Sequence, residues 1–543
     1  MPATHEVTNQ VPPRTGVDEF GTNAALLEGV ARHDAGWVGE RLHAIGARVG
    51  SAGFQEDAVL ANTREPVLAA FDRWGHRIDE VVYDESYHRI IRAALADGAH
   101  TGAWAEPRPG ANVARAAAFM LYAQVEPGHA CPVSMTHAAW PVIAGAAPEA
   151  IRGEWLPRLA STEYDERLVA GKPGAVFGMA MTEKQGGSDV RANTTRAVPL
   201  GEGMYALTGH KWFCSAPMSD AFLVLAQAPG GLSCFLVPRL LPDGARNTIR
   251  IQRLKDKLGN RANASSEIEY EDTIGWLLGE EGRGVRTIID MVQQTRLDCI
   301  LGSTAGMRQS TAEAAWHVRH RAAFGATLID QPAMTAVIAD LQLETEAATA
   351  AALRLARAED EDASEEERAF RRLATPVTKY WVCKRGPGHA YEALECLGGN
   401  GYTEAFPLAM RYREQPVMAV WEGSGNVIAL DVLRAMTREP DTVAAFDAEV
   451  ARAAGESAAF DAHLERIRAL VRSTLTSEEP AARARELVAA LALALEASLL
   501  IRFAPPTVAD GFVAARLGEG AAAGHLYGAL PSGVDAAAIA ARA

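Results

Sequence analysis

The chain has 543 residues, of which 48% are hydrophobic, and its formal net charge is −15. This length predicts three or four domains of roughly 100–200 residues each, and the acidic balance disfavours non-specific attraction to nucleic acid or anionic lipid. No stretch reaches the roughly 18 uninterrupted apolar residues of a membrane span, and the first residues lack the order of a signal peptide. We therefore expect a cytoplasmic protein that does not span a membrane.

Composition and periodicity divide the chain into four parts. Residues 1–175 show Ala-rich helical periodicity and predict an N-terminal helical domain. In residues 176–283, short apolar runs alternate with Gly, Pro, Asn and Asp turns, which is typical of a compact β domain. Long helical patterns in residues 284–438 predict a helical bundle, and residues 439–543 form a further Ala-rich helical domain. The predicted fold is mainly α with a central β domain.

Charged and metal-binding residue types add little to this division. The acidic run Glu359–Glu367 interrupts the bundle pattern and is expected to be a solvated corner between helices. The six cysteines have no CxxC spacing and are expected to be buried thiols. The 14 histidines form no HExxH pair, so no metal site is predicted.

Two glycine clusters stand out. Residues 179–190 open the β stretch and contain Gly186-Gly187-Ser188-Asp189, a pattern that can turn tightly and aim several donors at one ligand. A plain turn between strands explains the same residues. Residues 398–402, Gly-Gly-Asn-Gly-Tyr, follow a helical pattern and read by themselves as a helix C-cap and turn. They do not form the GxGxxG of a strand-to-helix dinucleotide turn.

Glu422 is the strongest candidate for a catalytic residue. An apolar stripe with helical period follows it, so it stands at or just before the first turn of a buried helix. Apolar surroundings raise the pKa of a carboxylate, whereas a helix N-terminus lowers it, and a general base benefits from this balance. Alternatively, the glutamate only helps the helix to begin. The stripe consists of Val427, Ile428, Leu430, Val432, Leu433 and Met436.

Three motifs in this order resemble those of the acyl-CoA dehydrogenase flavoprotein family. Residues 180–189 match its first signature, and residues 398–424 match its second signature and its catalytic stretch. Arg321-x-x-Phe324-Gly325 resembles its flavin-contacting segment from a neighbouring subunit. Residues 181–190, 256–264 and 421–426 look like the AidB-like branch, which is associated with the response to DNA alkylation. The resemblance implies helical N-terminal and C-terminal domains around a middle β-barrel, plus an extra C-terminal helical domain.

The resemblance implies FAD as the cofactor. By position, Thr182 lies near the pyrimidine edge of the flavin ring, and the Ser215 hydroxyl can bond flavin N5 or O4. Phe213 stands where the family usually has a tryptophan, so the indole N–H is lost. Arg321, Phe324 and the glycines of residues 398–401 would bind the adenine and pyrophosphate end of FAD across a subunit interface. This implies an oligomer, usually a tetramer. The expected flavin-binding residues are Met179, Thr182, Ser188, Phe213, Cys214, Ser215, Arg321, Phe324, Gly398, Gly399, Gly401, Ser424 and Asn426.

The resemblance also implies oxidation of a CH–CH group. Glu422 matches the family's usual base, which removes the α-proton of an acyl-CoA or related thioester while the β-hydride passes to flavin N5. The rival base position is Thr295, which cannot serve, and Arg296 beside it is expected to give electrostatic support. An electron-transfer flavoprotein or oxygen is the expected acceptor. Ser188, Gln293 and Gly423 are expected at the substrate, and Gln293 replaces a common aspartate, which indicates a branched or unusual acyl chain.

The AidB-like branch implies a second hypothesis: a DNA-binding flavoprotein that protects DNA from alkylation with little or no turnover. Residues 441–543 hold nine arginines, no lysine and thirteen acidic residues, which does not favour DNA by gross charge. A local basic face would have to carry the contact. The candidate residues are Arg434, Arg466, Arg468 and Arg472.

Overall fold

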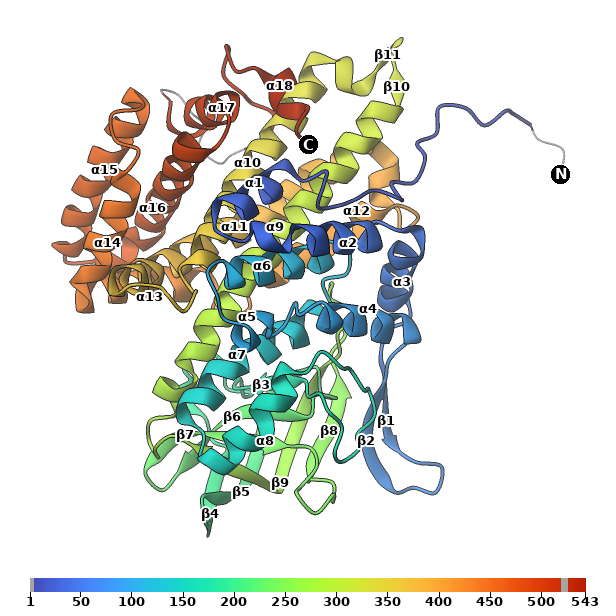
Figure 1. Ribbon diagram of the computed structural model, residues 1–543, viewed down its shortest axis with the longest axis vertical. Coiled ribbons are helices and arrows are strands. Elements are labelled where there is room, and N and C mark those ends of the chain that lie inside the picture. The colour runs from blue at the N-terminus through green and yellow to red at the C-terminus, as the bar shows by residue number, and fades with distance from the viewer. Residues whose placement is uncertain (1–3, 519–525) are drawn as a thin grey trace. The chain divides into compact units, whose positions relative to one another are not determined.

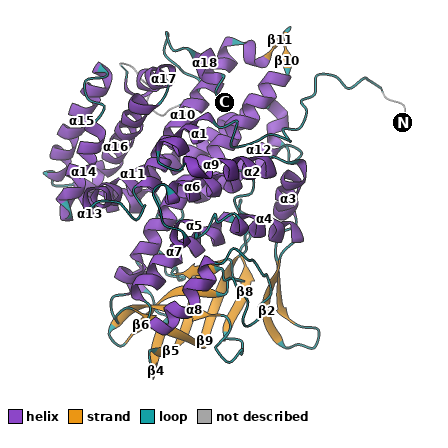
Figure 2. Ribbon diagram, in the orientation of Figure 1, coloured by secondary structure: helices purple, strands orange, loops and turns teal. Residues whose placement is uncertain are grey.

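The computed structural model describes residues 4–518 and 526–543, which form two compact units. The first unit comprises residues 1–52, 108–125 and 299–543, and the second comprises residues 53–107 and 126–298. The long helix α9 (Gly284–His320) contributes to both, because the division falls after Asp298. Helices dominate the first unit and most strands lie in the second (Figures 1 and 2).

A seven-stranded sheet forms the centre of the second unit. Strand β6 pairs with β4 and with β7, and the path β4–β5–β9–β7 joins those two, so five strands close into a barrel. Strand β3 pairs in parallel with β6, and β8 pairs with β9. This confirms the predicted central β domain. The strands are β3 (Phe177–Ala180), β4 (Arg196–Gly201), β5 (Met204–Ser215), β6 (Ala221–Ala228), β7 (Gly231–Pro238), β8 (Ile249–Leu254) and β9 (Ser265–Leu278).

The barrel closes around apolar side chains that point inward from its strands. Phe222, Val224, Phe235 and Val237 have no or almost no exposed surface, and they pack in one cluster with Ile268. Strands β6 and β7 are apolar along nearly their whole length, as expected for strands buried on both faces. The helices of this unit are α3 (Ala52–Thr63), α4 (Glu85–Ala96), α5 (Gly102–Ala105), α7 (Ala130–Ala146), α8 (Glu149–Ala160) and the 3₁₀ turn η2 (Val190–Ala192).

A hairpin interrupts the helices that the sequence predicts before residue 175. Strands β1 (Val67–Phe71) and β2 (Arg77–Val82) pair antiparallel. The turn between them is stabilised by Asp72, whose carboxylate accepts the backbone N–H groups of Trp74 and His76 at 2.8 and 2.9 Å. An Asx-type turn of this kind competes with a helix, and helical periodicity alone does not reveal it.

The first unit is a bundle of helices with the N-terminal segment packed on it. Its long members α10 and α11 each contact several other helices, and the 3₁₀ turn η4 lies between α11 and α12. The elements are α1 (Ala24–Arg32), η1 (Gly36–Val38), α2 (Gly39–Val49), α6 (Ala111–Ala123), β10 (Ala322–Ala323), β11 (Ala326–Thr327), η3 (Leu328–Asp330), α10 (Pro332–Arg357), α11 (Glu365–Glu395), η4 (Gly398–Tyr402), α12 (Pro407–Met418) and α13 (Gly425–Arg438).

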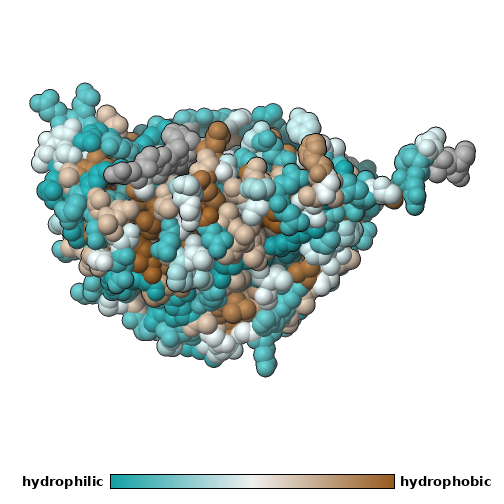
Figure 3. Space-filling view, turned by 90° about the horizontal axis from the view of Figure 1, so that it is seen from above, coloured by the Kyte–Doolittle hydropathy of each residue, from teal (hydrophilic) through white to brown (hydrophobic). Residues whose placement is uncertain are grey.

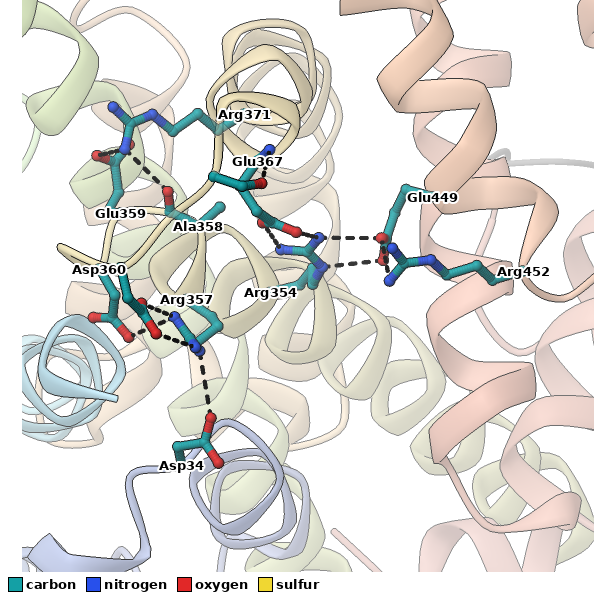
Figure 4. Close-up of polar contacts among 12 residues, drawn as sticks. Asp34, Arg354, Arg357, Ala358, Glu359, Asp360, Glu367, Arg371, Glu449 and Arg452 are labelled. Carbon is teal, nitrogen blue, oxygen red and sulfur yellow. Dashed lines mark hydrogen bonds and ion pairs between the residues drawn. The ribbon is translucent and has the colours of Figure 1, made fainter. Parts of the chain in front are cut away.

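The acidic run Glu359–Glu367 forms the corner between α10 and α11, but part of it is buried. Glu359 pairs with Arg371 at 2.7 Å, and Asp360 accepts the backbone N–H of Gly110 at 2.8 Å. Both carboxylates have less than a tenth of their surface exposed, so the expected solvated corner is wrong for them (Figure 4). Buried acids need such partners, because an unpaired buried charge is costly. At the start of α11, the Ser364 hydroxyl caps the helix by accepting the N–H of Glu367.

The residues after 438 form helices, as the sequence predicts, and they belong to the same compact unit as the bundle. Arg354 on α10 contacts Glu367 at 2.8 Å and Glu449 on α14 at 3.0 Å (Figure 4). The Ala- and Leu-rich stretch of α16 is almost entirely buried against its neighbours. The helices are α14 (Pro440–Ala451), α15 (Ala458–Leu475), α16 (Pro480–Phe503), α17 (Pro506–Leu517) and α18 (Ala536–Ala540).

Apolar residues lie mainly inside both units. The face in Figure 3 is mostly hydrophilic, with apolar side chains scattered between polar ones. All six cysteines are free and buried, as the sequence predicts. Within the described residues, no helix combines the length and apolarity that crossing a membrane requires.

Candidate active site

Glu422 lies in the loop between α12 and α13. Ser424 occupies the N-cap position of α13, and the first turn of that helix contains no acidic residue. Glu422 therefore lies just before the first turn, which is one of the two positions that the sequence allows. Its φ is +57°, a left-handed conformation that non-glycine residues rarely adopt. Such a conformation costs roughly 1–3 kcal/mol and persists only where its surroundings impose it.

Lys379 on α11 holds this loop from both sides of Glu422. Its Nζ donates to the carbonyl oxygens of Trp421 and Gly423, each at 2.6 Å, and the residue is 1% exposed. A buried ammonium group with three donors is well suited to gather carbonyl oxygens. Sequence reasoning missed Lys379, because it lies 43 residues before Glu422 in an ordinary helical pattern.

The loop is also fitted closely around its neighbours. Trp421 packs against Cys299, Cys383 and Met418. Gly423 has φ +113°, and an added Cβ would lie 3.1 Å from Cδ1 of Ile428. A side chain at this position would be both strained and crowded. The loop therefore presents Glu422, which is half-buried, in one conformation next to the N-terminal end of α13.

In the second unit, Glu183 anchors the glycine loop of residues 181–190. Its carboxylate accepts the N–H groups of Thr194 at 2.6 Å and Thr195 at 3.1 Å and pairs with Lys211 at 2.9 Å. Burial opposes ionisation of Glu183, but these hydrogen bonds and Lys211 outweigh it and lower the pKa to about 2. Glu183 and Lys211 are both fully or almost fully buried; Glu183 belongs to the first family signature, whereas no motif predicts its partner Lys211.

Some of the residues expected at the flavin ring lie on two segments that a backbone hydrogen bond joins, the glycine loop and the end of β5. The N–H of Trp212 donates to the carbonyl of Thr182 at 2.8 Å, so the glycine loop and the end of β5 are joined. Phe213 is 49% exposed although it is aromatic. The hydroxyl of Ser215 lies 3.1 Å from that of Ser265. Met179 and Thr182 are half-buried.

The space beside Gly187 and the position of the Cys214 side chain can be compared with what a flavin ring requires. An added Cβ on Gly187 would lie 2.5 Å from Oγ1 of Thr182, so only glycine leaves this part of the loop open. An exposed aromatic ring, the hydroxyls of two half-buried residues and an open glycine turn suit the flat, polar-edged ring of a flavin. Cys214 differs, because its side chain is fully buried in the barrel core and burial raises its pKa to about 12. Cys214 can therefore contact a flavin only through its backbone.

The segments expected to bind the adenine and pyrophosphate end of FAD do not adjoin the loop of Glu422 in the sequence. Arg321 and Phe324 belong to the short hairpin β10–β11, and Phe324 is completely exposed at φ +53°. Gly398, Gly399 and Gly401 lie in η4. An added Cβ on Gly401 would collide with the carbonyl of Leu394, whereas Gly398 and Gly399 face open space. Ser424 and Asn426 are exposed at the start of α13.

The remaining predicted residues lie on α9 and on the C-terminal helices. Gln293 is half-buried and Arg296 is buried, and the hydroxyl of Thr295 bonds the carbonyl of Met291 at 3.1 Å within the helix. Of the arginines expected at DNA, Arg468 is held by Asp447 at 2.9 Å and Glu465 at 2.8 Å. Arg466 donates to His463, Arg434 lies 3.7 Å from Asp431, and Arg472 is exposed.

Comparison with protein families assigns three consecutive segments. Residues 9–166 match the adaptive response protein AidB N-terminal domain. Residues 178–273 match the acyl-CoA dehydrogenase middle domain, and residues 282–437 match the acyl-CoA dehydrogenase C-terminal domain. The putative acyl-CoA dehydrogenase AidB of Escherichia coli (strain K12) is 45% identical over 512 residues, which cover 94% of this chain and 94% of that protein.

Solved structures agree with this assignment. Caenorhabditis elegans ACDH-11 in complex with C11-CoA superposes with a TM-score of 0.86 at 26% identity and covers 94% of this chain and 92% of that one. The apo-form of Bd2924 superposes with a TM-score of 0.83 at 27% identity and covers 91% of this chain and 100% of that one.

The fold and the site define an FAD-dependent oxidoreductase that acts on a CH–CH group. In chain order, helices precede and follow the strands of a β barrel, and the loop before α13 carries a glutamate. The chain belongs to the acyl-CoA dehydrogenase family, and its N-terminal part is of the AidB type.

Proposed function

We propose that Glu422 is the base that removes the α-proton of an acyl-CoA thioester. The observation that carries this proposal is the left-handed conformation of Glu422 in a loop that Lys379 holds on both sides. Strain of this kind is kept where a side chain must point in one direction. Glu422 stands two residues before the N-cap of α13, and a general base acts in its ionised form.

FAD, when bound, supplies the acceptor for the β-hydride. Thr182 and Ser215 would orient the flavin ring by hydrogen bonds, and Phe213 would pack on it. Arg296 would support the charge that develops on the thioester, and Gly423 would leave room for it beside the base. Met179, Ser188, Arg321, Phe324, Gly398, Gly399, Gly401, Ser424 and Asn426 would complete the cofactor site, with Ser188 and Gln293 also near the substrate.

The substrate proposed is a branched or otherwise unusual acyl-CoA. Support comes from the structurally similar ACDH-11, which was solved with C11-CoA, and from Gln293, an uncharged residue at a position where a carboxylate is common. We propose an electron-transfer flavoprotein or oxygen as the acceptor. The six buried free thiols support a reducing, cytoplasmic location.

We also propose a homo-oligomer, with a tetramer as the expected state. Phe324 supports this, because a completely exposed phenylalanine at a hairpin tip is an apolar group that a second subunit or its cofactor can cover. Analytical ultracentrifugation of the FAD-loaded protein tests the state. A monomer at micromolar concentration would contradict it.

Anaerobic titration with a panel of straight and branched acyl-CoAs tests the reaction. We expect at least one of them to bleach the flavin absorbance of the wild-type protein. Glu422→Gln should retain FAD and show no bleaching, whereas Glu439→Gln, a matched change in the next loop, should bleach as the wild type does. Bleaching by Glu422→Gln would refute the assignment of the base.

DNA binding remains a prediction for Arg434, Arg466 and Arg472. Arg468 contributes little to it, because two carboxylates already hold its guanidinium group. Binding driven by phosphate contacts must weaken steeply as salt is added. If duplex DNA is a ligand, Arg472→Gln should lower both the affinity and its salt dependence, while Arg468→Gln changes neither. Affinity that stays flat from low to physiological salt would reject the hypothesis.

A further inference from the structure

A cavity of about 490 Å³ lies in the second unit beside the barrel. It is lined by the end of β2, one face of α4, and residues near 164–176, 216–220 and 239. Its size is within the usual range of small-molecule sites, roughly 300–1,000 Å³. None of the flavin-ring residues predicted in this unit lines it, although the structure describes them all; Ala216, which follows Ser215, is the nearest lining residue in the chain.

One wall of the cavity is apolar and aromatic. The rings of Tyr83 and Tyr87 stack with their centres 4.4 Å apart, and Ile91 and Pro132 extend the same wall. Nδ1 of His88 lies 2.9 Å from the hydroxyl of Tyr164, so these two polar groups satisfy each other. This wall offers contact area to an apolar body.

Arg239 lines the cavity just after β7 and is 7% exposed. Its guanidinium group has two long contacts, each of 3.4 Å, to the sulfur of Met218 and the carbonyl of Asp79. Among the residues that the structure describes, no carboxylate oxygen lies within 4.0 Å of this guanidinium group, the limit for an ion pair. Burial lowers its pKa to about 10, so it stays cationic at neutral pH. Five N–H donors with such weak partners are costly in a buried position.

The buried ion pair in the cavity, Lys172 with Asp220, is already satisfied. Nζ of Lys172 pairs with Asp220 at 2.7 Å and donates to the carbonyls of Asp165 at 2.8 Å and Arg167 at 3.2 Å. The second oxygen of Asp220 accepts the N–H of Val176 at 2.9 Å. Arg239 is therefore the cation of this cavity that retains donors for a ligand.

We propose that this cavity binds a small monocarboxylic acid, with the carboxylate on Arg239 and the apolar body against the tyrosine wall. A guanidinium group matches a carboxylate in a bidentate arrangement. A phosphate dianion fits less well, because the lining residues include four carboxylates (Glu80, Asp165, Glu166 and Asp220) against three cations (Arg167, Lys172 and Arg239). This site is distinct from the proposed reaction of Glu422 and does not depend on it.

Calorimetric titration of the full-length, FAD-loaded protein with hexanoate and benzoate tests the proposal. We expect saturable binding of at least one acid, with hexanamide, benzamide and phenyl phosphate binding at least about tenfold more weakly. The flavin spectrum should not change, and acyl-CoA should not compete. No binding of either acid, equal binding of the amides, tighter binding of phenyl phosphate, or competition by acyl-CoA would each overturn the proposal.

Three variants locate the ligand. Arg239→Gln should lose about tenfold or more in affinity. Arg167→Gln is the matched control, because Arg167 lines the same cavity but is exposed and already pairs with Asp165 at 2.7 Å, so its affinity should stay within about twofold. Ile91→Phe fills the cavity while it keeps Arg239, and it should also weaken binding, which covers the case in which Arg239→Gln does not fold. Wild-type affinity in both Arg239→Gln and Ile91→Phe would reject the site.

Discussion

Nζ of Lys379 lies 2.6 Å from the carbonyl oxygen of Gly423, the residue that follows Glu422. Together with the equal contact to Trp421, this bond holds the peptide group before Glu422 and the peptide group after Gly423. A general base must be held within a narrow range of positions, since a displacement of about 1 Å can cost roughly 100-fold in rate. Lys379 is therefore a positioning residue, which acts through the backbone.

Lys379→Met should keep the fold and FAD but slow flavin reduction by acyl-CoA by about 100-fold. Two charge-assisted hydrogen bonds are lost and two carbonyls lose their donor, so stability should fall by about 2–4 kcal/mol. Stopped-flow absorbance and urea denaturation measure the two effects. Lys384→Met is the matched control, because Lys384 is an exposed lysine of the same helix, and it should change stability by less than about 0.5 kcal/mol. A wild-type reduction rate in Lys379→Met would remove the positioning role.

Glu422→Gly should make the protein more stable while it abolishes flavin reduction. Glycine adopts a φ of +57° without a steric penalty, so the variant should gain about 1 kcal/mol of unfolding free energy. Glu439→Gly is the control, because Glu439 has φ −133°, where glycine only adds freedom to the unfolded chain and should destabilise. The urea midpoints of both variants give the comparison. If Glu422→Gly is less stable than the wild type, the left-handed conformation is not a source of strain.

Glu183 should make stability depend on pH below the usual carboxylate range. Its pKa is about 2 in the folded protein against a usual value of 4.5, so the unfolded chain binds the proton first as pH falls. The stabilisation is complete above about pH 4.5 and is lost between there and pH 2. Glu183→Gln should flatten this part of the curve and lower stability at pH 7 by about 3 kcal/mol, because Lys211 stays buried without its partner. Urea denaturation from pH 7 to pH 3 measures both effects, and an unchanged slope would contradict the prediction.

Local patterns in the sequence determined much of the fold. Helical periodicity predicted the helices that precede and follow the barrel in the chain, because burial on one face of a helix imposes a regular spacing of apolar residues. Gly, Pro and Asp turns between short apolar runs predicted the β domain. Periodicity did not predict the hairpin β1–β2, because the Asp72 side chain stabilises a turn that leaves no periodic signal. No local pattern predicted that Asp360 is buried, because its hydrogen-bond partners, Gly110 and Asn112, lie about 250 residues away in the sequence.

The sequence by itself also determined the family motifs and Glu422 as the candidate base, since these are short segments whose residue types carry their own chemistry. Only the tertiary structure decided how Glu422 is held. Its left-handed backbone, the hydrogen bonds of Lys379 to the loop, the anchoring of the glycine loop by Glu183 and the long contacts of Arg239 all involve groups that lie elsewhere in the chain. Hydrogen bonds and burial act through space, so no local pattern can specify them.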